Sequence, residues 1–243
     1  LLTSVKDEKD RSAVYLNECR KMGIKVLPPD VNDSDFDFTP RGTDIRFGLS
    51  AIRNVGANVV ASIIATRRRV GRFADFHDFI AKVDASVCNK RVVESLIKAG
   101  AFDSLEANRA TLAASIGLAF DFADSQLAHA DQGGLFDDMT DSHAASTQEP
   151  ALVAADAWSI RERLTLEKAA VGFFLSGHLF DQSVDEVRRF AKRTIADLLD
   201  SREPQLLAGI VSDLRVVNGQ RGRVAIFKID DKTEVLEAVA NEE

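Results

Sequence analysis

Apolar residues recur at helical spacing over most of the chain, and the pattern becomes strand-like after Pro204. The first helix is expected over residues 11–22, and Gly23 follows as a natural stop before an extended segment, 24–30. The pattern therefore predicts a mainly α fold that ends in β structure.

Two segments in the first half have the pattern of a helix, a tight turn and a second helix. In the first, residues 52–56 form a predicted hairpin before an amphipathic helix. The apolar side of that helix carries Val59, Val60, Ile63 and Ile64. The second segment covers residues 73–105, where Asn89 can cap a helix and Gly100 can end it. Both segments are typical of helix-hairpin-helix motifs.

A hairpin of this kind exposes backbone N–H groups at the start of a helix, and these bind phosphate without reading a base. Charge agrees with this function, because residues 41–72 hold seven arginines and one acid, Asp44, a net charge of +6. The alternative is a solvated basic helix end stabilised by the helix dipole, which could account for residues 67–69. We favour DNA binding. The candidate contacts are Arg53, Asn54, Gly56, Arg67, Arg68 and Arg69.

Three aspartates, Asp33, Asp35 and Asp37, alternate in a turn-rich segment before the arginines. Paired carboxylates could hold metal ions for phosphoryl transfer. Aspartates beside Asn, Ser and Pro are more often solvated turn residues that bond their own backbone, and we favour that interpretation.

An alanine-rich helix is expected over about residues 107–128, and the composition then changes. Residues 121–156 contain eight acids and no lysine or arginine, which predicts a loop or linker over much of this segment. Within it, the stretch DQGGLFDD presents Leu135 and Phe136 among acids and glycines. Two large apolar side chains in such a setting need an explanation.

After residue 158 the pattern predicts a helix, SIRERLTLEKAAVGFFL, and then a short helical pair that ends near Leu199. The remainder predicts three antiparallel strands joined by turns, the start of a small barrel. Because three strands do not close a barrel, we expect a frayed or disordered C-terminal tail.

Composition narrows the function classes. The 243 residues are 45% hydrophobic and 28% charged, enough for one large domain or two small ones. The net charge of −7 requires any nucleic-acid surface to be local. Two cysteines and four scattered histidines indicate neither a disulfide framework nor a zinc site, and a cytoplasmic location fits. No apolar run is long enough for a membrane span, and the initial leucine leads us to interpret the chain as a fragment.

Six stretches occur in an order that resembles the bacterial replicative DNA polymerase III alpha-subunit family over nearly the whole chain. They are YLNECRKMGIKVLPPDVN, FGLSAIRNVG, NKRVVESLIKAGAFDSL, QGGLF, SGH and LAGIVSDLRVV. The resemblance implies a mainly α fold, in which a tandem helix-hairpin-helix domain precedes a partial, truncated OB-fold β-barrel. The implied divisions are the end of the fingers domain (1–30), a helix-hairpin-helix clamp-binding domain (31–130), an acidic linker with the clamp peptide (131–157), a helical connector (158–204) and the partial OB fold (205–243).

The resemblance also implies partners: DNA, the sliding clamp (the beta subunit) and other polymerase III holoenzyme subunits. Gln132, Leu135 and Phe136 match the family's clamp-binding peptide, since two apolar anchors can enter a preformed pocket. The family's catalytic aspartates, which use magnesium, lie upstream, so no catalytic residue, metal or cofactor is expected within this chain. Two departures stand out: Asn54 replaces the usual hairpin glycine, and GHL replaces GHP around His178, which we interpret as structural.

Two alternatives remain open at this point. The chain could come from an error-prone polymerase of the same family. It could also be a non-catalytic DNA-binding adapter that shares helix-hairpin-helix units and a clamp peptide.

Overall fold

The structure is a computed structural model that describes residues 2–5, 9–132, 149–219 and 222–241. Its contacts divide the chain into two compact units, Leu1–Ser176 (unit 1) and Gly177–Glu243 (unit 2). This division falls inside the segment predicted as the helical connector. None of the helices in the described ranges has the length and apolar character needed to cross a bilayer.

Unit 1 begins with a helix and a small sheet. Its first elements are η1 (Thr3–Val5), α1 (Lys9–Lys21), β1 (Val26–Leu27), β2 (Thr39–Arg41) and β3 (Asp44–Arg46). The α1 helix and the stop at Gly23, where φ is +73°, confirm the prediction. The sheet, in the order β1-β3-β2, was not predicted, because strands of two or three residues are too short to show a period.

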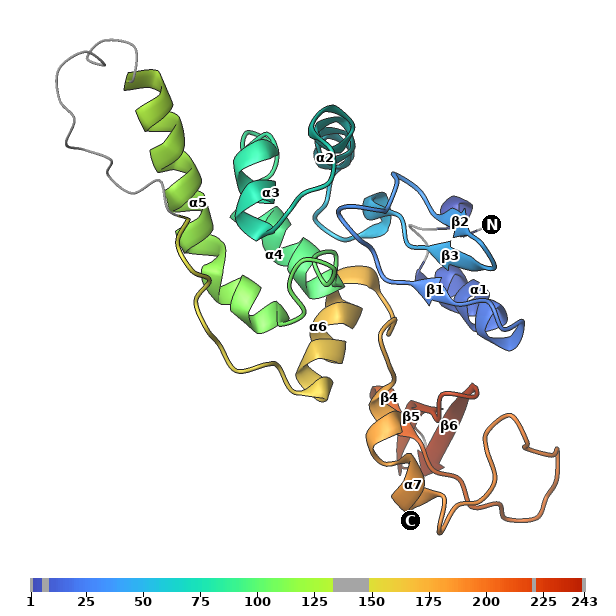
Figure 1. The fold of residues 1–243 in the computed structure, drawn as a ribbon. Coiled ribbons are helices and arrows are strands. Elements are labelled where there is room, and N and C mark those ends of the chain that lie inside the picture. The colour runs from blue at the N-terminus through green and yellow to red at the C-terminus, as the bar shows by residue number, and fades with distance from the viewer. Residues whose placement is uncertain (1, 6–8, 133–148, 220–221, 242–243) are drawn as a thin grey trace. The chain divides into compact units, whose positions relative to one another are not determined.

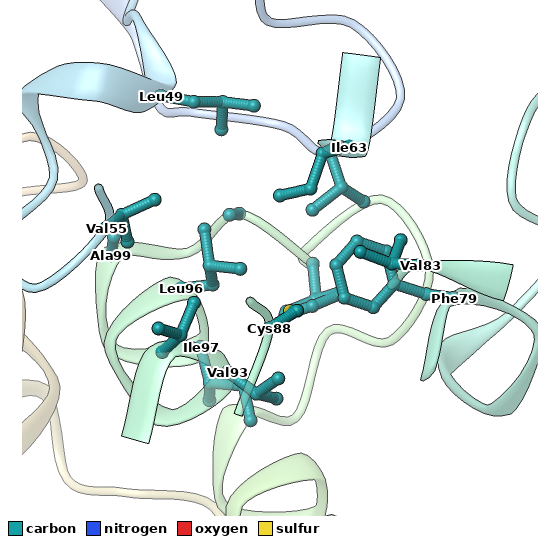
Figure 2. Close-up of a cluster of buried hydrophobic side chains, with 14 of the residues drawn as sticks. Leu49, Val55, Ile63, Phe79, Val83, Cys88, Val93, Leu96, Ile97 and Ala99 are labelled. Carbon is teal, nitrogen blue, oxygen red and sulfur yellow. The ribbon is translucent and has the colours of Figure 1, made fainter. Parts of the chain in front are cut away.

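Tandem helices follow, and they build the main core. They are η2 (Leu49–Ala51), α2 (Ala57–Val70), α3 (Phe76–Lys82) and α4 (Lys90–Ala99). As predicted, Asn89 caps α4, since its side chain accepts a hydrogen bond from Val92 N, and Gly100 ends α4 in the left-handed conformation. Figure 2 shows one buried cluster in which side chains from α2, α3 and α4 meet. Cys88 belongs to it, and burial raises the pKa of its thiol to about 12, so it packs as a neutral apolar group.

Two further helices complete unit 1 (Figure 1): α5 (Arg109–Gln132) and α6 (Ile160–Val171). The α5 helix confirms the predicted alanine-rich helix and extends it by one turn. Between α5 and α6, the chain returns along α5 as an extended strap, residues 150–158, in which Val153 N donates to Ser115 Oγ. Asn108 Nδ2 also donates to Ala155 O, so the strap is fixed near the beginning of α5.

A buried ion cluster joins α4, α5 and α6. The Arg109 guanidinium is 3% exposed and lies 2.6 Å from Asp103 Oδ2 and 3.2 Å from Glu167 Oε2. It also donates to Lys98 O at the end of α4. The fully buried Glu167 uses its other oxygen to accept backbone N–H groups from Leu175 and Ser176. Every charge in this cluster therefore has a partner, as a buried charge requires.

Unit 2 contains two short helices and a sheet. Its elements are η3 (Leu179–Gln182), α7 (Val184–Val187), β4 (Ile210–Gly219), β5 (Gly222–Asp230) and β6 (Val235–Asn241). The three strands form an antiparallel sheet in sequence order, as predicted. β4 has a bulge between Ser212 and Arg215, but the pairing of β5 with β6 continues without a break to Asn241, so the expected frayed tail is not found among the described residues. The described strands form an open sheet and do not close into a barrel.

Two buried polar residues organise unit 2. His178 caps η3, because its Nδ1 accepts a hydrogen bond from Phe180 N, which agrees with the structural role inferred for it. Asp231 accepts hydrogen bonds from Arg188 Nη2 (2.7 Å), Ile195 N (2.9 Å) and Thr233. Burial raises the pKa of Asp231, but hydrogen bonds from Thr233 and Arg188 outweigh it and lower the pKa to about 2.

We predict that Asp231→Asn destabilises unit 2 by about 1.5–3 kcal/mol at neutral pH, because charge-assisted hydrogen bonds are lost. Since the folded-state pKa lies below the unfolded value, the carboxylate's contribution is present above pH 4 and lost as the pH falls towards 2. Hydrogen exchange of the β4–β6 amides measures the neutral-pH effect, and circular dichroism measures the acid transition. Asp200→Asn, at an exposed position of unit 2, is the matched control; equal exchange in the two variants would contradict the prediction.

Candidate nucleic-acid interface

The first hairpin lies between η2 and α2. Asn54 adopts a left-handed backbone with φ of +63°, the conformation for which asparagine is the best substitute for glycine. Gly56 is the N-cap of α2 and provides no capping side chain, and both residues are exposed. The first-turn amides of α2 therefore lack a side-chain cap from this position, as an anion-binding helix start requires.

Two polar residues dock this hairpin on the rest of unit 1. Arg53 N donates to Ala170 O, and Arg53 Nη1 donates to Ala169 O at 2.7 Å, so Arg53 satisfies carbonyl groups in the last turn of α6. Asn54 Nδ2 donates to Ser95 Oγ on α4. A phosphate contact by Arg53 would have to share a guanidinium that already fixes the hairpin to α6.

The structure separates the three arginines that end α2. Arg67 is half-buried, and its Nη1 donates to Val31 O (3.1 Å) and Ser34 O (2.8 Å). Its Nη2 also lies 3.4 Å from Asp35 Oδ1. Arg68 and Arg69 are exposed, and their side chains have no partner among the described residues. Arg67 therefore holds α2 to the preceding turn, whereas Arg68 and Arg69 are available to a ligand.

The aspartates before the hairpin neutralise part of the basic segment. Asp33 forms ion pairs with Arg46 (2.9 Å) and Arg41 (3.2 Å), and Asp35 pairs with Arg67. The net charge of +6 counted along residues 41–72 thus overstates the free positive charge, because these acids lie outside that range in sequence. They are ion-pair partners and not only solvated turn residues.

The second hairpin, residues 83–89, differs from the first. The side chain of Asn89 accepts a hydrogen bond from Val92 N, so the N-terminus of α4 already has a side-chain cap. Two exposed cations follow: Lys90, which pairs with Asp121 at 3.5 Å, and Arg91. Sequence reasoning did not single them out, although two basic residues in a first helical turn oppose the helix dipole and are a usable signal.

Of the predicted clamp peptide, the structure describes only Gln132. Gln132 is the last residue of α5, which at 24 residues is about 36 Å long. Leu135 and Phe136 lie outside the described residues. Along the chain, α5 therefore separates Gln132 from the exposed cations of both hairpins.

Comparisons with known proteins support the assignment of helix-hairpin-helix motifs. Residues 23–112 match the family model described as a helix-hairpin-helix motif. The chain is 42% identical over 231 residues to a DNA polymerase III subunit alpha of Neisseria meningitidis, a match that covers 95% of the chain and 20% of the relative. It is 45% identical over 216 residues to that of Mycobacterium leprae (88% of the chain, 17% of the relative) and 33% identical over 262 residues to that of Pseudomonas aeruginosa (98% and 22%).

The chain spans about a fifth of the length of the relatives it matches. Its resemblance to the DNA polymerase III alpha subunit is confirmed across both units, because the aligned segments cover nearly all of its residues.

We predict that Arg67→Ala destabilises unit 1 by about 1–3 kcal/mol, since it leaves two carbonyl groups and Asp35 without their donor. Urea denaturation followed by the fluorescence of Trp158, which packs against the core of unit 1, gives the measurement. The matched control, Arg68→Ala, is expected to change stability by less than about 0.5 kcal/mol. Equal losses in both variants would show that the bonds of Arg67 contribute nothing beyond those of a surface arginine.

Proposed function

Starting from this similarity to a fifth of the DNA polymerase III alpha subunit, we propose that the chain is the part of a replicative polymerase that holds duplex DNA and tethers the enzyme to the sliding clamp. The observation that carries the proposal is the first hairpin. Its uncapped helix start and two exposed arginines lie within the segment that matches the helix-hairpin-helix model. Phosphate contacts of this kind position a protein on DNA without sequence preference.

Each part of the interface has a distinct role in this proposal. The amides at Gly56 and the start of α2 bind one phosphate, and Arg68 and Arg69 bind others nearby. Asn54 supplies the turn, while Arg53 and Arg67 position the hairpin and α2 through their bonds to the chain's own carbonyl groups. DNA affinity then depends on all six predicted residues. Gly56, Arg68 and Arg69 contribute by direct contact, and Arg53, Asn54 and Arg67 contribute by holding the hairpin and α2 in place.

Clamp tethering is assigned to Gln132, Leu135 and Phe136. Support comes from the acidic, glycine-containing sequence around two apolar anchors and from the position of Gln132 at the end of a long helix. Other holoenzyme subunits are further expected partners, and the cytoplasm is the expected location.

The sheet of unit 2 is proposed to be the first part of an OB fold. Successive residues of a strand point to opposite faces, so the register defines which side chains share a face. One face is apolar over most of its length, and its apolar members are Val216, Ala225, Ala240, Phe227, Ala238, Val211, Ile229 and Leu236. Among the described strand pairs of this face, only Asn218 and Arg223, near the β4–β5 turn, add polar side chains. An apolar sheet face of this kind requires a second layer, as the interior of a barrel provides.

Nucleotide addition is proposed for the whole polymerase and not for this chain. Two-metal phosphoryl transfer, with magnesium, needs carboxylates that are free to coordinate. Asp33 and Asp35 do not fit, because arginines occupy their oxygens, and the described residues contain no cluster of three or more potential ligands. We therefore assign no catalytic residue here.

The extent of the match favours this proposal over a non-catalytic adapter. An adapter that shared only helix-hairpin-helix units would account for residues 23–112, whereas the similarity extends through unit 2. An error-prone member of the family stays the second candidate.

We predict sequence-independent duplex binding with a steep salt dependence. Arg68→Ala combined with Arg69→Ala should reduce the magnitude of the slope of log K against log salt by up to about 2, since each lost phosphate contact contributes about 0.9. Fluorescence anisotropy with a labelled duplex over a salt series gives the slope. Arg161→Ala, at an exposed position near the start of α6, is the matched control. An unchanged slope would leave only the solvated-helix interpretation of these arginines.

We predict that Leu135→Ala combined with Phe136→Ala abolishes clamp binding. A short peptide with two anchors is expected to bind in the micromolar range, about −8 kcal/mol, and each lost anchor costs on the order of 2–4 kcal/mol. Calorimetry against the matching clamp gives the affinity, and circular dichroism verifies folding. Leu127→Ala, an exposed leucine on α5, is the control and should bind as wild type does. Undiminished binding by a folded double variant would exclude these side chains as the anchor.

A further inference from the structure

Unit 2 contains a hollow that neither the DNA contacts nor the clamp peptide uses. It lies within the segment from Phe190 to Leu206 and has a volume of about 370 Å³. That volume is at the lower end of the range for sites that take a small ligand or a single large side chain.

The hollow is lined by unusually exposed apolar residues. Phe190 is 74% exposed, and Leu199 and Leu206 are each 66% exposed, so these side chains are among the most exposed large apolar groups of the described chain. Single exposed apolar residues are ordinary on protein surfaces, but three that line one hollow form a contiguous patch. Such a patch gains free energy when another apolar group covers it.

Charge around the hollow is opposite to that of the chain. Lys192 and Arg193 line it together with one acid, Glu203, whereas the whole chain has a net charge of −7. The cations are exposed and lie beside the apolar residues, so they favour a ligand that carries both an apolar group and negative charge.

The walls of the hollow are fixed by hydrogen bonds within the segment. Arg193 Nη1 donates to Gln205 Oε1, and Gln205 Nε2 donates to Leu199 O, both at 2.9 Å. Arg188 Nη1 donates to Arg193 O at 2.6 Å, and Arg188 is itself held by the buried Asp231. A site formed before binding costs less ordering entropy when it is filled.

We propose that this hollow binds a short acidic segment of a partner protein, which inserts one large apolar side chain beside Phe190 and places carboxylates at Lys192 and Arg193. Two of the three exposed apolar residues are leucines, which offer no aromatic face on which a base could stack. A peptide therefore fits the lining better than a nucleic-acid strand. This site is independent of the proposed DNA and clamp contacts.

The test uses the full 243-residue chain and a fluorescein-labelled hexapeptide, Asp-Asp-Leu-Phe-Asp-Asp. Anisotropy is expected to show saturable binding, and hydrogen exchange is expected to show protection confined to residues 188–206. Phe190→Ala should weaken binding tenfold or more, as loss of a central aromatic anchor does. Lys192→Glu should also weaken it, and Met22→Ala, an equally exposed residue of unit 1, should have no effect.

Two control peptides separate the contributions. Replacing Leu-Phe by Ala-Ala, or the four aspartates by lysines, should abolish binding. The proposal is overturned if wild-type chain does not bind, if Phe190→Ala binds as tightly as wild type, or if the Ala-Ala peptide binds equally. Displacement of the acidic peptide by oligothymidylate, with the same residues protected, would also overturn it and identify a nucleic-acid strand as the occupant.

Discussion

The arrangement of unit 1 depends on the buried ion pair between Arg109 and Glu167. Arg109 stands at the first residue of α5 and Glu167 in the middle of α6, and both side chains are removed from water. Such a pair contributes little net stability compared with apolar packing, but losing one partner leaves a buried charge and is strongly destabilising. The pair therefore contributes more to the specificity of the helix arrangement than to its stability, since other packings of α5 and α6 would leave a buried charge without a partner.

The same cluster links the interface to the core. Glu167 precedes by two and three residues the carbonyl groups that receive Arg53 from the first hairpin. The other carboxylate oxygen of Glu167 accepts a hydrogen bond from Leu175 N, in the chain after α6. Arg20 of α1 donates to Phe174 O in the same stretch. The end of α6 is thus where three arginines from separate parts of the chain converge. They hold the hairpin on a rigid support, as the proposed contacts with phosphates at a fixed spacing require.

Local features of unit 1 could be predicted from the sequence because their causes are local. Asn89 and Gly100 bound α4 through hydrogen bonds and backbone conformations that involve only a few neighbouring residues. The roles of Arg53 and Arg67 could not be predicted, because their partners are more than thirty residues away and no spacing rule identifies them. The charge count over residues 41–72 failed for a different reason: Asp33 and Asp35 lie just before that range and pair with arginines inside it. The strands β1, β2 and β3 were missed because two or three residues are too few to show an alternating pattern.

The strap along α5 has a consequence for how the acidic segment can vary. Gln132 belongs to α5, and the strap is bonded near the start of the same helix, so both ends of the intervening segment are anchored independently of what lies between them. Closing a longer segment costs only about 0.6 kcal/mol for each doubling of its length. Insertions there should therefore be tolerated by the fold, and a cut backbone in that segment would leave two pieces that stay associated through the strap.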